Sequence, residues 1–436
     1  MKHIALLGAL LLAVQPSLAY PLPQATPAVK AAPAPAFKAR LDQLVVLLNG
    51  GGDYAALFSP AFREAVPQAQ LQTYIDQLKA EGGKATGIES VAPATAWNGT
   101  VQIAYQKMVA TMRVAVDAAA PHQIIGLLIT GAEPRDDSFA KLEADFAKLP
   151  GASGFGVYAL GGDGVTPVAE MNGMAAAPLG SAFKLWVLAE AAREIAAGER
   201  HWDDVVPVGR HSLPGGILQN WPAAAPVTLQ TLATLMISIS DNTAADTLLT
   251  TLGREKVDAM VKTVGIADSA RTLPVLTTME AFELKAPAHA ALAAAWAKDS
   301  PEARAKLLDD NAAAFAATPI DPHMFGARPL LIDSVEWFAS PRDMARTLDW
   351  LRRNGDATSR AILAVNPGAG AATANRFDYI GFKGGSEPGV ITLNFLVRTK
   401  AGKWLAVTGN WHHPDAAVSE AGFAALMNRA LLLAAR

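Results

Sequence analysis

The spacing of apolar positions divides the chain into two regions of different pattern. From Phe37, apolar residues recur every three or four positions until Gly50-Gly51-Gly52, which predicts a helix that the glycines end. Two further helices are predicted over residues 59–65 and 67–80. Alternating segments typical of strands then follow at residues 86–91, 100–107, 112–116 and 123–130. We therefore predict a small N-terminal α+β domain over residues 37–131.

The second region begins with a predicted helix at residues 139–149 and a hairpin formed by residues 155–160 and 165–171. A mostly helical stretch covers about residues 181–353. Three more strands and a terminal helix are predicted at residues 378–382, 390–397, 404–409 and 414–435. A lone hairpin is only marginally stable, so strands from both ends of this region are expected to share one sheet. This predicts a second domain, residues 137–436, with helices on both faces of an antiparallel sheet and a helical lobe.

The N-terminus has the pattern of a cleavable secretory signal. Lys2 and His3 precede an apolar run at residues 4–14, and small residues at Ser17 and Ala19 indicate cleavage after Ala19. The alternative is an uncleaved anchor, but the run is shorter than the roughly 20 residues of a membrane span. Residues 20–36 are rich in proline and alanine and read as an extended linker. We expect a periplasmic or secreted bacterial protein, with residues 1–19 removed and no membrane span afterwards.

Composition narrows the chemistry. Hydrophobic residues make up 51% of the chain and charged residues 18%, which excludes a disordered protein. A formal net charge of −3 provides no basic surface for nucleic acid. The absence of cysteine excludes disulfides, cysteine-based metal sites and thiol nucleophiles. Any nucleophile is therefore a hydroxyl, a carboxylate or an amine.

Three short motifs occur in a fixed order. Ser181-Ala182-Phe183-Lys184 begins an apolar helix, Ser240-Asp241-Asn242 separates two helical patterns, and Lys383-Gly384-Gly385-Ser386 is predicted at a strand end. Each is weak alone, since Ser138-Phe139-Ala140-Lys141 is a second S-x-x-K and is interpreted as structural. The three motifs occur in a fixed order and on the kinds of element that the chemistry needs. We therefore take the motifs that begin at Ser181, Ser240 and Lys383 as the candidate site.

The residue types of these motifs suit acyl transfer. Residues three apart on a helix share a face, so Lys184 can lie against the hydroxyl of Ser181. Burial and a second nearby cation, Lys383, both favour the neutral amine. Neutral Lys184 can then take the proton of Ser181 as that hydroxyl attacks a carbonyl.

The remaining motif residues fit supporting roles. Ser240 can relay a proton to the leaving atom, and Asn242 offers an amide that orients the substrate. The backbone N–H groups of Ser181 and Ser386, with Gly385 beside them, are candidate donors to an oxyanion.

These motifs resemble those of the penicillin-recognising serine hydrolases, most closely the class A β-lactamases, over residues 137–436. The resemblance implies that Ser181 is the nucleophile, Lys184 the base, Ser240 the proton shuttle and Lys383 an electrostatic partner. It implies an αβα domain acting on a small molecule without a metal or organic cofactor. The whole chain is similar to a secreted subfamily in which a small steroid-isomerase-like domain precedes the hydrolase domain.

Several positions depart from that family. Gly384 stands where the family has Thr or Ser, so a hydroxyl that contacts a substrate carboxylate is missing. The sequence pattern that contains the family's deacylating glutamate is absent. Glu280 and Glu283 are the nearest candidates for this role, and the alternative is that both are ordinary surface charges on a helix that faces solvent. Residues 287–321 read as an inserted helical segment. Trp221 follows a loop and is either a wall of the cleft or a packing residue.

The sequence therefore predicts an exported active-site-serine hydrolase that cleaves a β-lactam or a related ester or amide through an acyl-enzyme. Two alternatives remain: an esterase or peptidoglycan peptidase using the same residues, and a penicillin-binding or sensing protein that is acylated without turnover. For residues 37–131 we expect a packing or substrate-gating role, because no acid/base set stands out there.

Overall fold

The computed structural model describes residues 32–162, 164–212, 215–324, 326 and 328–436. The described residues divide into two compact units, with the division between Ser138 and Phe139. The predicted signal peptide lies outside the described residues, as does the predicted linker up to residue 31. In the part of the chain that is described, no helix is both long and apolar enough to cross a bilayer.

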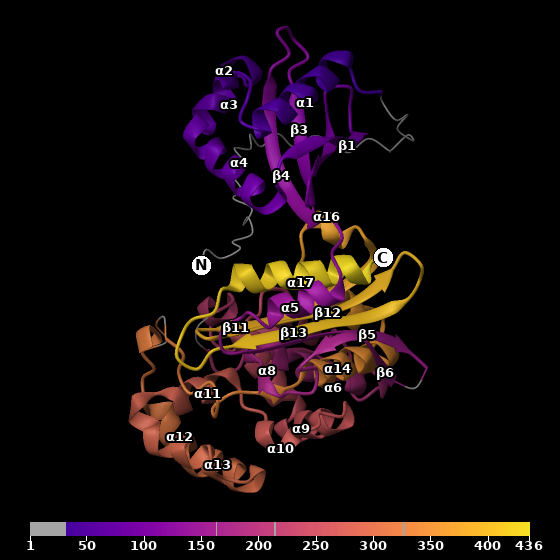
Figure 1. The fold of residues 1–436 in the computed structure, drawn as a ribbon. Helices are drawn as coiled ribbons and strands as arrows, with labels where there is room; N and C mark the ends of the chain where they lie inside the picture. Colours follow the sequence, from indigo (N-terminus) through magenta and orange to yellow (C-terminus); the bar gives the residue numbers. More distant parts are fainter. Residues whose placement is uncertain (1–31, 163, 213–214, 325, 327) are drawn as a thin grey trace. The chain divides into compact units, whose positions relative to one another are not determined.

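In the first unit, helices precede an antiparallel sheet with the strand order β1-β2-β3-β4 (Figure 1). The apolar faces of α1 and α4 share one core with residues of the strands, among them Phe37, Ile75 and Val101. Helix α2 was not predicted, because four residues are too few to show a helical period. The elements are α1 (Pro35–Leu48), α2 (Tyr54–Leu57), α3 (Pro60–Ala65), α4 (Gln68–Gly82), β1 (Ala85–Pro93), β2 (Asn98–Tyr105), β3 (Met108–Val116) and β4 (Ile124–Pro134).

The second unit is built on a five-stranded antiparallel sheet with the order β11-β12-β13-β5-β6. Strands from both ends of the region share this sheet, so the predicted fold class is confirmed. The strands are β5 (Ala152–Gly161), β6 (Gly164–Met171), β11 (Phe377–Glu387), β12 (Val390–Thr399) and β13 (Trp404–His412).

Helices cover both faces of this sheet (Figure 1). Val157 packs in a core with residues of α5 (Phe139–Phe146) and α17 (Glu420–Ala434), whereas its neighbour Tyr158 belongs to the core that contains α6 (Lys184–Ala196) and α14 (Pro341–Asn354). Successive strand residues point to opposite faces, which is why one strand contributes to two cores.

The predicted helical lobe follows α6, and the predicted insertion at residues 287–321 contains η3, α12 and α13. The lobe and its flanking helices are α7 (Leu229–Ser238), α8 (Asn242–Leu252), α9 (Arg254–Thr263), α10 (Ser269–Thr272), α11 (Thr278–Lys285), α12 (Ala290–Trp296), α13 (Pro301–Ala317), α15 (Ala357–Ala364) and α16 (Ala371–Ala374). The short elements are η1 (Gly180–Phe183), η2 (Leu218–Asn220), η3 (Pro287–His289), η4 (Pro322–Met324), β7 (Ala177–Pro178), β8 (Val205–Pro207), β9 (Pro226–Thr228) and β10 (Phe338–Ala339).

Strand β11 differs from its prediction. The pattern placed its end at residue 382, but pairing with β12 continues through Gly384 opposite Leu393 to Glu387 opposite Val390. Gly385 is paired within the strand and packs against the backbone of residues 179–182. The third motif therefore forms the C-terminal part of the sheet-edge strand β11.

Candidate active site

Ser181 lies on the 3₁₀ turn η1, directly before α6, and not within the α-helix itself. In a 3₁₀ turn, residues three apart are eclipsed, so Ser181 and Lys184 lie on the same side of the chain. Gly180, the residue before the serine, has a φ of +49°, a conformation that favours glycine. The approach to the turn is held by a hydrogen bond from the N–H of Leu179 to the carbonyl of Trp337.

Lys184 is completely buried at the start of α6. Its Nζ donates to the carbonyl of Ser240 at 2.7 Å, to Oδ1 of Asn242 at 2.6 Å and to Oγ of Ser240 at 3.2 Å. Burial lowers the pKa of Lys184 to about 7, although the charges of Asp246 and Asp241 act in the opposite direction. A substantial fraction of this amine is therefore neutral near neutral pH and can accept a proton.

Ser240 lies between α7 and α8 in a left-handed backbone conformation with a φ of +61°. Such a conformation is strained in a residue other than glycine, and strain of this kind clusters at functional sites. The next residue, Asp241, holds the loop in place. Its side chain caps α8 through the N–H of Ala244 at 2.8 Å and also accepts from the N–H groups of Ile217 at 2.6 Å and Leu218 at 2.9 Å.

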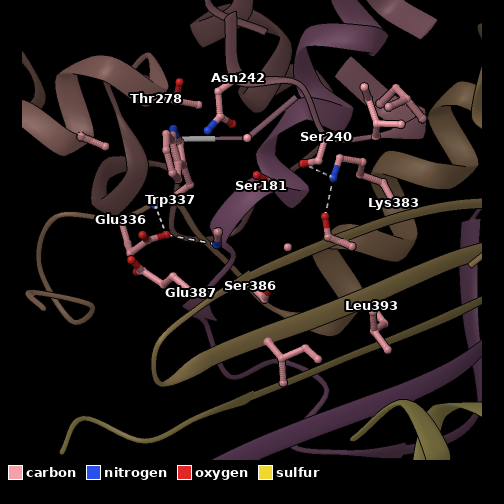
Figure 2. Close-up of a pocket in the computed structure, with 18 of the residues that line it drawn as sticks. Ser181, Ser240, Asn242, Thr278, Glu336, Trp337, Lys383, Ser386, Glu387 and Leu393 are labelled. Atoms are coloured by element: carbon pink, nitrogen blue, oxygen red, sulfur yellow. Dashed lines mark hydrogen bonds between the residues drawn. The ribbon is translucent and has the colours of Figure 1, made fainter. Parts of the chain in front are cut away.

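Lys383 reaches the same serine from β11. Its Nζ donates to Oγ of Ser240 at 2.9 Å, as Figure 2 shows, and its side chain is almost fully buried. Burial, together with the charge of Lys184, holds the pKa of Lys383 well below its usual value. The hydroxyl of Ser240 is thus within hydrogen-bonding distance of two buried amines.

The backbone of β11 lies directly against the turn that carries Ser181. A Cβ atom at Gly385 would lie 2.6 Å from the N of Ser181 and 2.1 Å from the O of Leu179, so only glycine fits there. A Cβ atom at Gly180 would lie 3.1 Å from the N of Ser386. The amides of Ser181 and Ser386 therefore come from two backbone segments in close contact, an arrangement that can offer two donors to one oxygen.

These residues line a cavity of about 610 Å³. Its wall includes Ser181, Ser240, Asn242, Lys383, Gly385 and Ser386 (Figure 2). Lys184 is not part of the wall, but it is fully buried and donates hydrogen bonds to two residues that are, Ser240 and Asn242. Trp221 is not part of the wall and is 39% exposed, so the interpretation of this residue as a wall of the cleft is wrong.

Gly384 also faces this cavity, and the space beside it is occupied. A Cβ atom there would lie 2.9 Å from Cζ of Phe382 and 3.0 Å from Cδ2 of Leu393. The aromatic ring and the leucine thus occupy room that a hydroxyl-bearing side chain would need. The missing hydroxyl is replaced by apolar surface.

Glu280 and Glu283 are not in the wall of this cavity, and the expectation of an ordinary surface charge is wrong for the buried Glu283. Both lie on α11 and line a second, smaller cavity of about 190 Å³. Glu280 completes a capping box with Thr277 and pairs with Arg254 at 2.6 Å. Glu283 is 1% exposed and lies 2.6 Å from a guanidinium nitrogen of Arg210. Their helix presents its other face, with Thr278 and Lys285, to the cavity of Ser181.

Sequence reasoning missed a group of charged residues that contact one another in the wall of the cavity. Lys285 donates to Glu336 at 3.0 Å and to both carboxylate oxygens of Glu387 at 2.7 Å. The lysine is 51 positions from the first glutamate and 102 from the second. No motif joins residues so far apart, so the sequence carried no signal for this group.

Comparison with known proteins identifies the family of the second unit. A family model described as "Beta-lactamase enzyme family" matches residues 137–361, which is just over half of the chain. That range contains Ser181, Lys184, Ser240 and Asn242 but ends before Lys383. No curated protein matches the chain in sequence.

Several solved structures are similar to this chain. A β-lactamase from Sphaerobacter thermophilus DSM 20745 is 22% identical, with 68% of this chain and 96% of that chain covered and a TM-score of 0.46. PBP-A is 15% identical, with 68% and 94% covered and a TM-score of 0.45. A β-lactamase from Chitinophaga pinensis DSM 2588 is 16% identical, with 68% and 98% covered and a TM-score of 0.45. By the family match, this chain belongs to the β-lactamase enzyme family and has a class A β-lactamase-like serine hydrolase fold.

Proposed function

We propose that the protein is an exported hydrolase in which Ser181 attacks the carbonyl carbon of a β-lactam or a related ester or amide. The observation that carries this proposal is the approach of Lys184 and Lys383 to one hydroxyl, that of Ser240, beside the cavity that Ser181 lines. The proposal of export rests on the signal-peptide pattern of residues 1–19.

In the proposed reaction, neutral Lys184 accepts the proton of Ser181 while the serine Oγ bonds to the carbonyl carbon. The N–H groups of Ser181 and Ser386 donate to the oxyanion. Ser240 passes its proton to the leaving nitrogen or oxygen as that bond breaks and regains a proton from Lys184. Water then hydrolyses the Ser181 ester, which releases the acid and restores the serine.

Mass spectrometry of the intact protein with a penicillin tests this proposal. The wild type should gain the mass of one penicillin, and Ser181→Ala should gain none. Lys184→Ala should be labelled far more slowly because its serine has no base. Labelling of Ser181→Ala at the wild-type rate would contradict the assignment of the nucleophile.

One observation favours an esterase or peptidase with the same residues over efficient β-lactam turnover. A Cβ atom at position 384 would lie 2.9 Å from Cζ of Phe382 and 3.0 Å from Cδ2 of Leu393, which leaves little room for a hydroxyl-bearing side chain. Single-turnover acylation and steady-state hydrolysis, compared for a cephalosporin and a simple acetyl ester, separate the alternatives. Faster turnover of the ester supports the esterase. An adduct on Ser181 that persists for hours supports a penicillin-binding protein without turnover.

We also propose a steroid-isomerase-like fold without catalysis of its own for residues 37–131. Helices followed by an antiparallel four-stranded sheet support this proposal. Isomerisation of a ketosteroid by the full-length protein would contradict it.

A further inference from the structure

Three charged side chains from separate parts of the second unit meet in the wall of the Ser181 cavity. Lys285 ends α11, Glu336 precedes β10, and Glu387 ends β11. Lys285 lies 3.0 Å from Glu336 and 2.7 Å from Glu387. The exposed fractions of the side chains are 2% for Lys285, 3% for Glu336 and 18% for Glu387. We call these residues the Lys285 triad.

The triad contacts the backbone next to each of the two candidate oxyanion donors, the amides of Ser181 and Ser386. Oε2 of Glu336 accepts a hydrogen bond from the N–H of Gly180 at 3.1 Å, and Gly180 directly precedes Ser181. Glu387 directly follows Ser386 in β11. Figure 2 shows Glu336, Glu387 and Ser386 in the same part of the site. One lysine therefore links the segment that carries the Ser181 amide to the segment that carries the Ser386 amide.

Stability alone is a poor explanation for such a group. Burial of charged groups carries a desolvation cost, and well-packed apolar residues of similar volume often stabilise a protein as well or better. The triad has two carboxyl groups for one amine. Burial and the neighbouring Glu336 raise the pKa of Glu387 well above its usual value, which illustrates that cost. What a buried ion pair does provide is a defined geometry, because each hydrogen bond constrains a distance and a direction.

We propose that Lys285, Glu336 and Glu387 are positioning residues that hold the amides of Ser181 and Ser386 at the spacing required to bind an oxyanion. This inference rests on the proposed role of Ser181 as nucleophile. None of the three side chains contacts the reacting atoms in this proposal. They act through the backbone of Gly180 and of the end of β11.

The test compares Glu336→Gln and Lys285→Met with Glu194→Gln in the full-length protein. Glu194 is a matched control because its carboxylate is also fully buried and paired with cations, Arg200 at 2.6 Å, Lys256 at 2.7 Å and Arg193 at 3.8 Å. Single-turnover labelling with a fluorescent penicillin gives two separate quantities. These are the maximal acylation rate and the penicillin concentration at which acylation reaches half of that rate. Affinity for phenylboronic acid, whose tetrahedral serine adduct places an oxygen between the two amides, is measured in parallel.

We expect the triad variants to lower the maximal acylation rate by about tenfold to a hundredfold, since complete loss of one oxyanion donor costs about a hundredfold or more. Affinity for the boronic acid should fall by a similar factor, while the half-saturating penicillin concentration stays unchanged. Glu194→Gln should change neither quantity. Wild-type acylation and boronic acid binding in both triad variants would overturn the proposal and leave the role of Ser181 intact.

A second measurement does not depend on catalysis. Hydrogen exchange of the peptide that covers residues 178–183 should be faster in Glu336→Gln than in Glu194→Gln, because a neutral amide oxygen is a weaker acceptor for the Gly180 N–H than a carboxylate. Unchanged exchange at this peptide in Glu336→Gln would overturn the positioning role. This outcome does not depend on whether Ser181 is a nucleophile. If penicillin does not label Ser181 of the wild type but exchange is faster in Glu336→Gln, the proposed function is contradicted. The positioning role of the triad is not contradicted by that result.

Discussion

Lys184 and Lys383 place their ammonium nitrogens around a single oxygen, 3.2 Å and 2.9 Å from Oγ of Ser240. The two lysines come from the start of a helix and from a sheet-edge strand, and both are buried. Two positive charges in one buried site disfavour each other, and burial disfavours each charge separately. The arrangement therefore favours a neutral amine next to the hydroxyl of Ser240.

The first prediction concerns pH. Burial lowers the pKa of Lys184 to about 7, so the amine is neutral above that pH and protonated below it. Acylation of Ser181 should therefore accelerate as pH rises through about 7 and fall about tenfold per pH unit below it. Stopped-flow labelling with a fluorescent penicillin measures the profile. A rate independent of pH in this range would show that Lys184 is not the base, and Lys184→Met should remove the dependence.

The second prediction concerns the hydroxyl between the two lysines. Ser240→Ala removes one acceptor of Lys383 and the proposed proton relay, so acylation should slow by about a hundredfold to ten-thousandfold. Ser386→Ala serves as the contrast, because only its backbone N–H has an assigned role and that group remains. Single-turnover labelling of both variants tests the difference. Equal rates in the two would contradict the relay.

The third prediction concerns Gly385. A Cβ atom there would lie 2.1 Å from the O of Leu179, so Gly385→Ala must displace β11 from the Ser181 turn. We expect a loss of about 1–3 kcal/mol in the free energy of unfolding, as for other overpacked sites, together with slower acylation. Gly161→Ala is the control on β5, since a Cβ atom there meets nothing within 4 Å. Denaturant unfolding and mass spectrometry measure the two effects, and unchanged acylation in Gly385→Ala would contradict the close contact.

The fourth prediction concerns Glu283, which lines the second cavity and not the cavity of Ser181. Glu283→Gln should leave the rate of deacylation unchanged. It should lower the free energy of unfolding by about 1–3 kcal/mol, because a buried partner of Arg210 is weakened. Decay of the penicillin adduct, followed by mass spectrometry, and denaturant unfolding test both parts. A stable adduct in the variant would identify Glu283 as the deacylating base after all.

Most of the fold was predictable because the helices and strands have clear periods. The strand hairpin that forms β5 and β6 and the strands near the C-terminus were expected to share a sheet, and they do. The errors lie where local chemistry is ambiguous. The strand was expected to end at residue 382, but it continues to Glu387, and the close approach of the Ser181 backbone requires glycine at position 385 within it. The burial of Glu283 was also missed, because its partner Arg210 is far away in the sequence.

The sequence by itself determined the candidate residues, since S-x-x-K, S-D-N and K-G-G-S are local patterns whose residue types suggest acyl transfer. Their order and the hydrophobic periods were enough to assign each to a helix start, a loop or a strand. Only the tertiary structure decided that Lys184, Ser240 and Lys383 meet around one hydroxyl, and that Lys285 joins Glu336 to Glu387. Such contacts depend on how helices and strands pack. The separation of these residues in the sequence does not show that they are neighbours in the folded protein.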